Sequence, residues 1–333
     1  MTPEAAFDRI VHCLDRAHDT SFKAKAFHRA RSVVRETALT ELTARAAADT
    51  LTELDGIGQS TATVITEALA GGVPRYLTDL EASTTVAITA AGQRYRDALR
   101  GDCHTHSTWS DGGDEIEDMA ATARDLGHDY MVLTDHSPRL TIAHGLNRQR
   151  LERQLEVLAE LNERVAPFRI LSGMEVDILE DGSLDLDDDL LARLDVVVAS
   201  VHSKLRMERR AMTERMVLAV ANPHVDILGH CTGRLIGKRP ASTFDADYVF
   251  AACARFGTAV EINCRPERLD PPRPLLDMAI EHGCWFAIDT DAHATGQLEW
   301  QAHGCDRAAE RDVPIERVIN TMGADDLVGW TAG

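Results

Sequence analysis

The residues best suited to chemistry in this chain are two histidines and a carboxylate between Asp102 and Gly112. His104 and His106 are separated by one residue, and alternate residues of a β-strand point to the same face. Asp111 follows in a glycine-containing turn. Neutral imidazoles and carboxylates are common ligands of zinc, manganese and iron. An isolated His-x-His pair is weak evidence by itself, but it suggests one edge of a metal site.

Further candidate ligands stand at or near the ends of apolar runs downstream. They are His136, Glu175, His202, His230, Asp291 and His293. A random distribution of histidines would not favour the ends of apolar runs so consistently. The other histidines fall mostly on predicted helices and loops, where we interpret them as surface or packing residues.

The elements that must position these residues begin near residue 101, where apolar runs rich in β-formers alternate with amphipathic helices. The predicted strands lie near 101–104, 130–134, 170–178, 195–201, 225–229, 258–262 and 284–289. The predicted helices lie near 114–126, 148–164, 187–194, 208–221, 245–256 and 274–282. Seven β-α units predict an α/β fold, a closed or nearly closed parallel barrel. Chemistry in such barrels lies at the carboxyl ends of the strands, where the candidate ligands fall.

Residues 1–95 have a different pattern, which predicts a small all-helical domain. Apolar residues recur at spacings of three and four within 5–14 and 22–34. Two further helices flank the turn Gly56-Ile57-Gly58. Glycine permits backbone conformations that other residues resist, and the following helix N-terminus offers free N–H groups to a phosphate.

This turn resembles a helix-hairpin-helix motif, which grips the DNA backbone without reading its sequence. The resemblance makes Gly56, Ile57 and Gly58 candidate DNA contacts. Motifs of this kind often carry a basic residue just after the hairpin, but Gln59 and Ser60 stand there. A tight helical connection that binds nothing is the alternative. The basic residues of segment 23–35 are either a second DNA-binding face or a solvated helix face.

Residues 101–322 resemble the polymerase-and-histidinol-phosphatase (PHP) domain, particularly that of bacterial family X DNA polymerases. The matching motifs are Cys103-His104-Thr105-His106-Ser107, Thr134-Asp135-His136-Ser137, Gly173-Met174-Glu175-Val176-Asp177, Ala199-Ser200-Val201-His202-Ser203, Leu228-Gly229-His230-Cys231-Thr232-Gly233-Arg234 and Asp289-Thr290-Asp291-Ala292-His293. Residues 1–80 resemble the N-terminal helical domain of the same polymerases. We therefore expect a helical domain over 1–95 and a PHP barrel over 101–333. The polymerase palm should separate these parts, and because it is missing, nucleotide polymerisation is not implied.

The PHP resemblance implies a distorted seven-stranded β/α barrel with two or three divalent metals, zinc, manganese or iron. It assigns the first metal to His104, His106, Glu175 and Asp291, the second to Glu175, His202 and His230, and the third to Asp111, His136 and His293. Some family members have histidine where this chain has Asp111. A complete ligand set argues against an inactive barrel.

The same resemblance implies hydrolysis of phosphate esters, with Glu175 and Asp291 at the reaction centre. Arg234 is the first candidate to clamp the phosphate, because a guanidinium matches phosphate in a bidentate way. Arg265 and Arg268 are further candidates. Surface or ion-pairing roles are the alternative for each of these arginines.

Composition narrows the functional classes. The chain has 333 residues and a net charge of −19, with 12 basic and 13 acidic residues in 1–100 but 23 basic and 41 acidic in 101–333. An acidic barrel repels nucleic acid and membranes at long range. No apolar run is long enough for a membrane span and no signal core is visible. Seven cysteines without framework spacing predict reduced thiols and a cytoplasmic protein.

Three functional hypotheses follow. The first is a phosphoesterase acting on DNA ends, as a 3′–5′ exonuclease or end-processing enzyme in DNA repair, to which the helical domain presents DNA. The second is a small-molecule phosphatase of the histidinol-phosphate type. The third is a DNA-binding module with an inactive barrel. The hairpin favours the first over the second, and the complete ligand set opposes the third. The sequence does not identify protein partners.

Overall fold

The computed structural model describes all 333 residues, which form two compact units. The first unit is Met1–Val86 with Thr295–Gln297, and the second is Ala87–Ala294 with Leu298–Gly333. None of the helices combines the length and the apolar composition that crossing a membrane would require.

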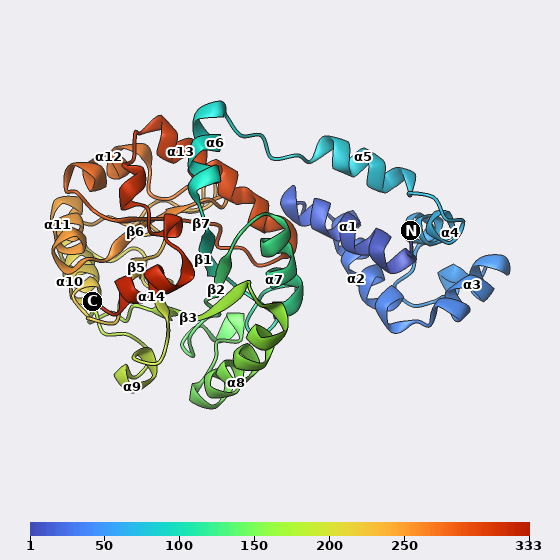
Figure 1. Ribbon diagram of the computed structural model, residues 1–333, viewed down its shortest axis with the longest axis horizontal. Coiled ribbons are helices and arrows are strands. Elements are labelled where there is room, and N and C mark those ends of the chain that lie inside the picture. Colours follow the sequence, from blue (N-terminus) through green and yellow to red (C-terminus); the bar gives the residue numbers. More distant parts are fainter. The chain divides into compact units, whose positions relative to one another are not determined.

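The second unit is built around seven parallel strands that follow one another in sequence order across the sheet (Figure 1). The strands are β1 (Gly101–Thr105), β2 (Tyr130–Leu133), β3 (Arg169–Asp177), β4 (Val196–Ser200), β5 (Ile227–Leu228), β6 (Ala259–Asn263) and β7 (Phe286–Asp289). Between β1 and β7, the Cys103 N–H donates to the Asp289 carboxylate at 2.8 Å, and Thr105 forms a parallel bridge with Ala292. The predicted nearly closed α/β barrel is therefore confirmed.

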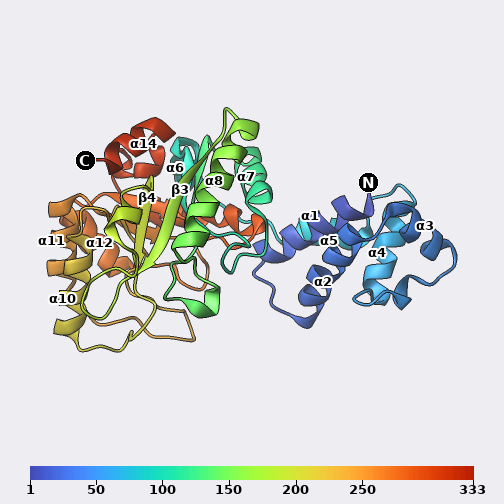
Figure 2. The same cartoon turned by 90° about the horizontal axis from the view of Figure 1, so that it is seen from below.

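Helices surround these strands, with α7 and α8 on one side and α10, α11 and α12 on the other (Figures 1 and 2). The α-helices of this unit are α6 (Ala90–Ala98), α7 (Ile116–Asp125), α8 (Arg148–Val165), α9 (Asp188–Leu191), α10 (Arg209–Val220), α11 (Ala246–Phe256), α12 (Arg273–Glu281), α13 (Gln301–Glu310) and α14 (Ala324–Thr331). Short 3-10 segments are η2 (Thr141–Ala143), η4 (Ile315–Arg317), η5 (Ile319–Thr321) and η3 (Thr295–Trp300), of which Thr295–Gln297 is assigned to the first unit. Because helices cover the strands, the strands need apolar side chains on both faces, and their sequences are continuous apolar runs. Strand β4, Val196–Ser200, is fully buried.

The first unit is all helical, as the sequence predicts. Its elements are α1 (Pro3–Arg16), α2 (Phe22–Glu36), α3 (Leu39–Ala47), η1 (Leu51–Glu53), α4 (Gln59–Leu69) and α5 (Arg75–Ser83). Phe7, Ile10, Phe27 and Ile65 are among the side chains of its own apolar core. Burial of these side chains contributes to the stability of the unit.

Helix α6 belongs to the barrel unit, although most of it lies within residues 1–95, the range predicted for the helical domain. The Tyr95 hydroxyl donates to the Val313 carbonyl at 2.6 Å, and Arg96 Nη2 donates to the Leu126 carbonyl at 2.6 Å. The Thr89 hydroxyl donates to Asp306 Oδ1 at 2.6 Å. These bonds connect residues distant in sequence, so local periodicity does not reveal them, and the division falls near residue 86.

Candidate metal centre

All nine predicted metal ligands lie at the carboxyl ends of the strands and in the loops that follow them. His104 and Glu175 lie within β1 and β3, while His106, Asp111, His136, His202, His230, Asp291 and His293 lie in the loops after β1, β2, β4, β5 and β7. Because neighbouring parallel strands end at the same rim of the barrel, the fold brings these side chains together.

Glu175 is the central residue of the cluster and is buried. His104 Nε2 and His106 Nε2 lie 3.3 and 3.5 Å from Glu175 Oε2. On the other carboxylate oxygen, His202 Nε2 and His230 Nε2 lie 3.1 and 2.9 Å from Glu175 Oε1. His136 Nδ1 also lies 2.9 Å from Glu175 Oε2. The two oxygens thus face different sets of imidazoles, which is the arrangement a carboxylate needs to bridge two cations.

Asp111 joins a second group of imidazoles. Its Oδ1 atom lies 3.5 Å from His136 Nε2 and 3.4 Å from His293 Nε2. The turn that carries Asp111 is tight, since the Gly112 N–H donates to the Ser107 carbonyl at 2.9 Å. A Cβ atom on Gly112 would lie only 2.6 Å from the Ser107 carbonyl carbon, so the turn requires glycine there.

The donor atoms form three overlapping groups, each with all of its ligand atoms within 4.8 Å of one another. The groups are His104, His106 and Asp291; His136, Glu175 and His202; and His106, Asp111, His136 and His293. Asp291 has a left-handed backbone with φ of 54°, which is costly for a residue other than glycine and recurs at functional sites.

Many polar atoms of this cluster are buried without a hydrogen-bond partner. They are Nε2 of His104, both ring nitrogens of His106, His202 and His230, Nδ1 of His136, and both carboxylate oxygens of Glu175. Leaving one such atom unsatisfied costs about 1–3 kcal/mol, so a cluster of them is stable only with a further partner. Divalent cations would satisfy these atoms together, and the donor set of imidazoles and carboxylates fits zinc, manganese or iron.

Electrostatics keep the central carboxylates ionised. Burial alone would raise the pKa of Asp291, but the Arg268 guanidinium and the His106 ring outweigh it and hold this pKa well below its usual value. Burial likewise opposes ionisation of Glu175, yet the imidazoles of His202 and His104 hold its pKa well below the usual value. Ionised carboxylates are the form that binds cations.

The three candidate arginines occupy different positions. Arg234 donates from Nε to the Arg268 carbonyl at 2.8 Å and from Nη2 to the Leu269 carbonyl, so its guanidinium holds the backbone of the next loop. Arg265 Nη1 donates to the Asp291 carbonyl at 3.0 Å. Arg268 points to the cluster, with Nε 3.0 Å from Asp291 Oδ2 and a buried Nη1 that has no hydrogen-bond partner. Arg268 is therefore the best placed of the three to bind an anion.

Carboxylates that the sequence analysis did not single out support the ligands from behind. Glu261 Oε1 lies 2.6 Å from His104 Nδ1, and the other oxygen of Glu261 accepts the His230 N–H. Asp177 Oδ1 accepts the His202 N–H at 3.1 Å. The contact with His104 Nδ1 fixes the orientation of that ligand ring, whereas the other two bonds hold the backbone N–H groups of His230 and His202. A sequence signal existed for Glu261, because it is a lone charge inside the fully buried strand Ala259–Asn263.

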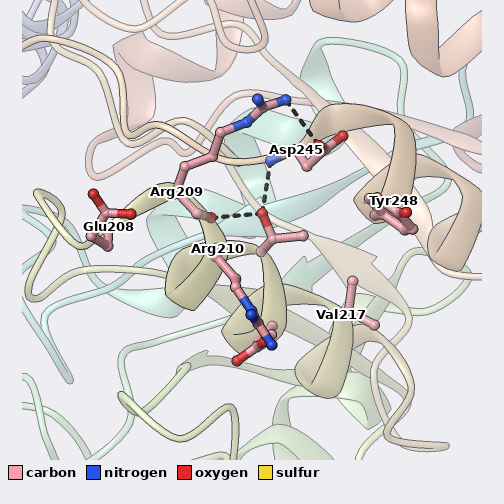
Figure 3. Close-up of a pocket in the computed structure, with 8 residues that line it drawn as sticks. Glu208, Arg209, Arg210, Val217, Asp245 and Tyr248 are labelled. Carbon is pink, nitrogen blue, oxygen red and sulfur yellow. Dashed lines mark hydrogen bonds and ion pairs between the residues drawn. The ribbon is translucent and has the colours of Figure 1, made fainter.

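A separate hollow of about 590 Å³ lies between α10 and α11 and contains none of the predicted ligands (Figure 3). It is lined by Glu208, Arg209, Arg210, Thr213, Glu214, Val217, Asp245 and Tyr248. Arg209 Nη2 pairs with Asp245 at 2.9 Å, and Thr213 Oγ1 accepts the Asp245 N–H at 2.8 Å. These polar groups satisfy one another, unlike those of the metal cluster.

In the first unit, the predicted hairpin joins η1 to α4. Gly56 has φ of 93°, Ile57 is buried, and Gly58 is the exposed N-cap residue of α4. Gln59 and Ser60, in the first turn of α4, are exposed too. Nearby, Arg29 of α2 pairs with Asp55 at 2.6 Å and Arg35 pairs with Asp8 at 2.9 Å, so at least two charges of the predicted basic face are already paired.

Comparison with known proteins agrees with this geometry. The family model described as the PHP domain matches residues 102–264. The chain is 41% identical over 229 residues to the DNA polymerase/3′-5′ exonuclease PolX of Bacillus subtilis (strain 168), covering 69% of this chain but 40% of that protein. It is 31% identical over 207 residues to a probable phosphatase of Thermoanaerobacter sp. (strain X514), covering 58% of this chain and 79% of that protein.

Among solved structures, one similar chain is the histidinol phosphate phosphatase of Lactococcus lactis, crystallised with zinc, L-histidinol and phosphate. It shares 17% sequence identity, with a TM-score of 0.43, and covers 63% of this chain and 94% of that one.

A seven-stranded barrel with a cluster of histidines and carboxylates at its rim is the arrangement of a metal-dependent hydrolase. The chain belongs to the PHP family. Its predicted general activity, metal-dependent hydrolysis of phosphate esters, is thereby confirmed at the level of the class.

Proposed function

We propose that this protein hydrolyses phosphate esters at DNA ends, as a 3′–5′ exonuclease or end-processing enzyme in DNA repair. The observation that carries the proposal is the presence, in one chain, of a histidine and carboxylate cluster and of a glycine-containing turn before an exposed helix N-terminus. The 41% identical relative is named a 3′-5′ exonuclease, which supports the same substrate class. We further propose a cytoplasmic location, supported by seven cysteines that are all free thiols.

In the proposed site, each residue has a distinct task. Two or three bound divalent metals would neutralise phosphate charge and activate water for attack on the ester. Glu175 would bridge two of them, and Asp291 would bind one while its second oxygen faces Arg268. The guanidinium of Arg268 would hold a phosphate oxygen through its unsatisfied Nη1. Glu261 would keep His104 oriented by its contact of 2.6 Å with Nδ1.

The helical unit would attach to the DNA backbone. The N-terminus of α4 presents the N–H groups of exposed residues, and its partial positive charge favours a phosphate. A Cβ atom on Gly58 would meet nothing within 4 Å, so a phosphate can approach this backbone closely. Because residues 101–333 are strongly acidic, such an attachment would offset the repulsion between the barrel and DNA.

A small-molecule phosphatase of the histidinol-phosphate type is the second candidate. It is favoured by the fact that the ligand cluster needs no part of the helical unit, since every ligand lies between His104 and His293. A relative covered over 79% of its length is named a probable phosphatase. The two candidates differ in whether the hairpin contributes to substrate binding.

The substitution Gly58→Asp in the full chain tests this difference. Aspartate is a favourable N-cap residue, so α4 should remain folded, while the new carboxylate occupies the N–H groups and repels phosphate. The rate ratio between an unmodified DNA oligonucleotide and p-nitrophenyl phosphate should fall at least about tenfold, most strongly at low salt. The matched control is Gly72→Asp, an exposed position in the same unit that makes the same charge change.

Equal ratios in the two variants would show that the hairpin does not deliver substrate. If the wild-type chain also hydrolyses only the small ester, the small-molecule phosphatase becomes the better hypothesis.

A further inference from the structure

The loops around the metal centre differ in charge. The loops after β4, β5 and β6, residues 201–208, 229–245 and 264–272, carry seven basic and four acidic side chains. The loops after β1 and β3, residues 106–115 and 178–187, carry seven acidic side chains and no basic one. We call the first three loops the basic rim. It stands out because residues 101–333 as a whole are strongly acidic.

The three loops of the basic rim form one continuous surface. A Cβ atom on Gly233 would lie 2.6 Å from Leu205 Cδ2, so the loops after β4 and β5 are in direct contact. The Ile236 N–H donates to the Glu267 carbonyl at 2.6 Å, which joins the loops after β5 and β6. The charges of the three loops therefore act on the same ligand.

A chain of polar contacts connects this surface to the metal centre. Lys238 Nζ lies 3.2 Å from Glu267 Oε2, and Arg265 Nε lies 3.1 Å from Glu267 Oε1. Arg265 Nη1 in turn lies 3.1 Å from His293 Nδ1. Lys238 is thus three contacts away from a predicted metal ligand, too far to touch a phosphate held at the metals but within the path of a longer substrate.

The cations of the basic rim are more available than its anions. Lys204, Arg206 and Lys238 are exposed. Lys204 lies 3.9 Å from Glu180 and Lys238 lies 3.2 Å from Glu267, while Arg206 forms no ion pair. Of the acidic residues, Asp270 is fully buried and Asp245 is paired with Arg209 at 2.9 Å. Glu267 pairs with Lys238 and Arg265, and Glu208 is exposed, so the basic rim keeps an excess of positive charge.

We propose that the basic rim binds the backbone phosphates of a nucleic-acid strand whose end lies at the metal centre. This inference rests on the proposed function and extends it by assigning the path of the strand. A small phosphate ester offers a single phosphate, whereas a strand offers one phosphate per nucleotide and so can also contact Lys204, Arg206 and Lys238. The acidic loops after β1 and β3 repel the strand, so it leaves the centre over β4, β5 and β6.

The test compares two triple variants of the full chain with equal net charge. One is Lys204→Glu with Arg206→Glu and Lys238→Glu, and the control is Arg124→Glu with Arg153→Glu and Arg164→Glu on exposed positions of α7 and α8. The probe is a fluorescent single-stranded oligonucleotide with phosphorothioate links, which resist hydrolysis. Its binding is followed by anisotropy across a range of salt concentrations.

The rim variant should bind the probe at least about tenfold more weakly than the control. The slope of the logarithm of the association constant against the logarithm of the salt concentration should decrease in magnitude by about 2, as expected for the loss of three phosphate contacts with a single strand. Equal affinity and slope in the two variants would overturn the proposal, as would a wild-type chain that does not bind the probe. Hydrolysis of an unmodified oligonucleotide is measured separately. A wild-type chain that binds strands through the rim without cleaving them would refute the proposed function alone.

Discussion

The substitution Glu261→Gln tests whether a carboxylate behind the ligands controls the metal centre. Glu261 uses both oxygens as acceptors, one 2.6 Å from His104 Nδ1 and one receiving the His230 N–H. Glutamine has nearly the same shape but only one acceptor, so its amide must present an N–H group either to His104 or to the His230 backbone. One of these two hydrogen bonds has to be lost.

The expected loss of metal affinity follows from the role of these two hydrogen bonds. Both bonds hold predicted ligands, and Glu261 itself is fully buried, so water does not replace a lost bond. Removing a carboxylate that orients a ligating histidine typically lowers metal affinity by about 10- to 100-fold, which corresponds to about 1.4–2.7 kcal/mol. The side-chain volume hardly changes, so the fold should be retained.

Metal affinity is measured by competition with a chelating indicator, for wild type, Glu261→Gln and the exposed control Glu163→Gln. Circular dichroism of each protein verifies that the barrel is intact. The control should bind metal as wild type does, and Glu261→Gln should bind it at least about tenfold more weakly. An unchanged affinity in a folded Glu261→Gln protein would refute the supporting role of Glu261.

Three further substitutions test other parts of the site and fold. Glu175→Gln should remove at least about 99% of phosphate-ester hydrolysis while the circular dichroism spectrum stays unchanged, because a bridging carboxylate binds two cations. Near-normal turnover would exclude Glu175 from the reaction centre. Arg268→Ala should lower kcat/KM at least about 100-fold. Arg268→Lys should recover part of this loss, since lysine restores the charge but not the bidentate geometry. Equal kinetics of the wild type and both variants would exclude Arg268 from phosphate binding. Burial raises the pKa of Asp226 to about 7, so the folded protein favours the protonated acid and loses stability as pH rises from about 4 through 7. Asp226→Asn should therefore stabilise the protein at pH 8 by about 1 kcal/mol and hardly at pH 4, as measured by denaturant unfolding; a loss of stability at pH 8 would contradict this reasoning.

The strands and their ligands could be predicted because the signals are local. A buried parallel strand needs a continuous apolar run, and β4 shows it as Val196, Val197 and Val198. Its carboxyl end then fixes where His202 must lie. The hydrophobic periodicity of α8 similarly predicts its observed range, Arg148–Val165, to within one residue.

The remaining features depend on contacts between distant parts of the chain. His104 and Glu261 are 157 positions apart, and no local pattern pairs them. Arg268 is better placed than Arg234 to bind phosphate because its side chain points to the metal centre. A sequence motif does not specify side-chain direction, and both arginines follow neighbouring strands. Helix α6 is short and amphipathic like the helices before it, and only its bonds to Val313, Leu126 and Asp306 assign it to the barrel.

The metal content of the full-length protein tests the central claim most directly. Elemental analysis of protein purified without chelators should find more than one equivalent of zinc, manganese or iron per chain. Eight candidate ligands form close groups, His230 lies 2.9 Å from Glu175, and many of their donor atoms are unsatisfied. A total below about half an equivalent, after attempted reconstitution with each of these metals, would contradict the assignment of this cluster as a metal centre.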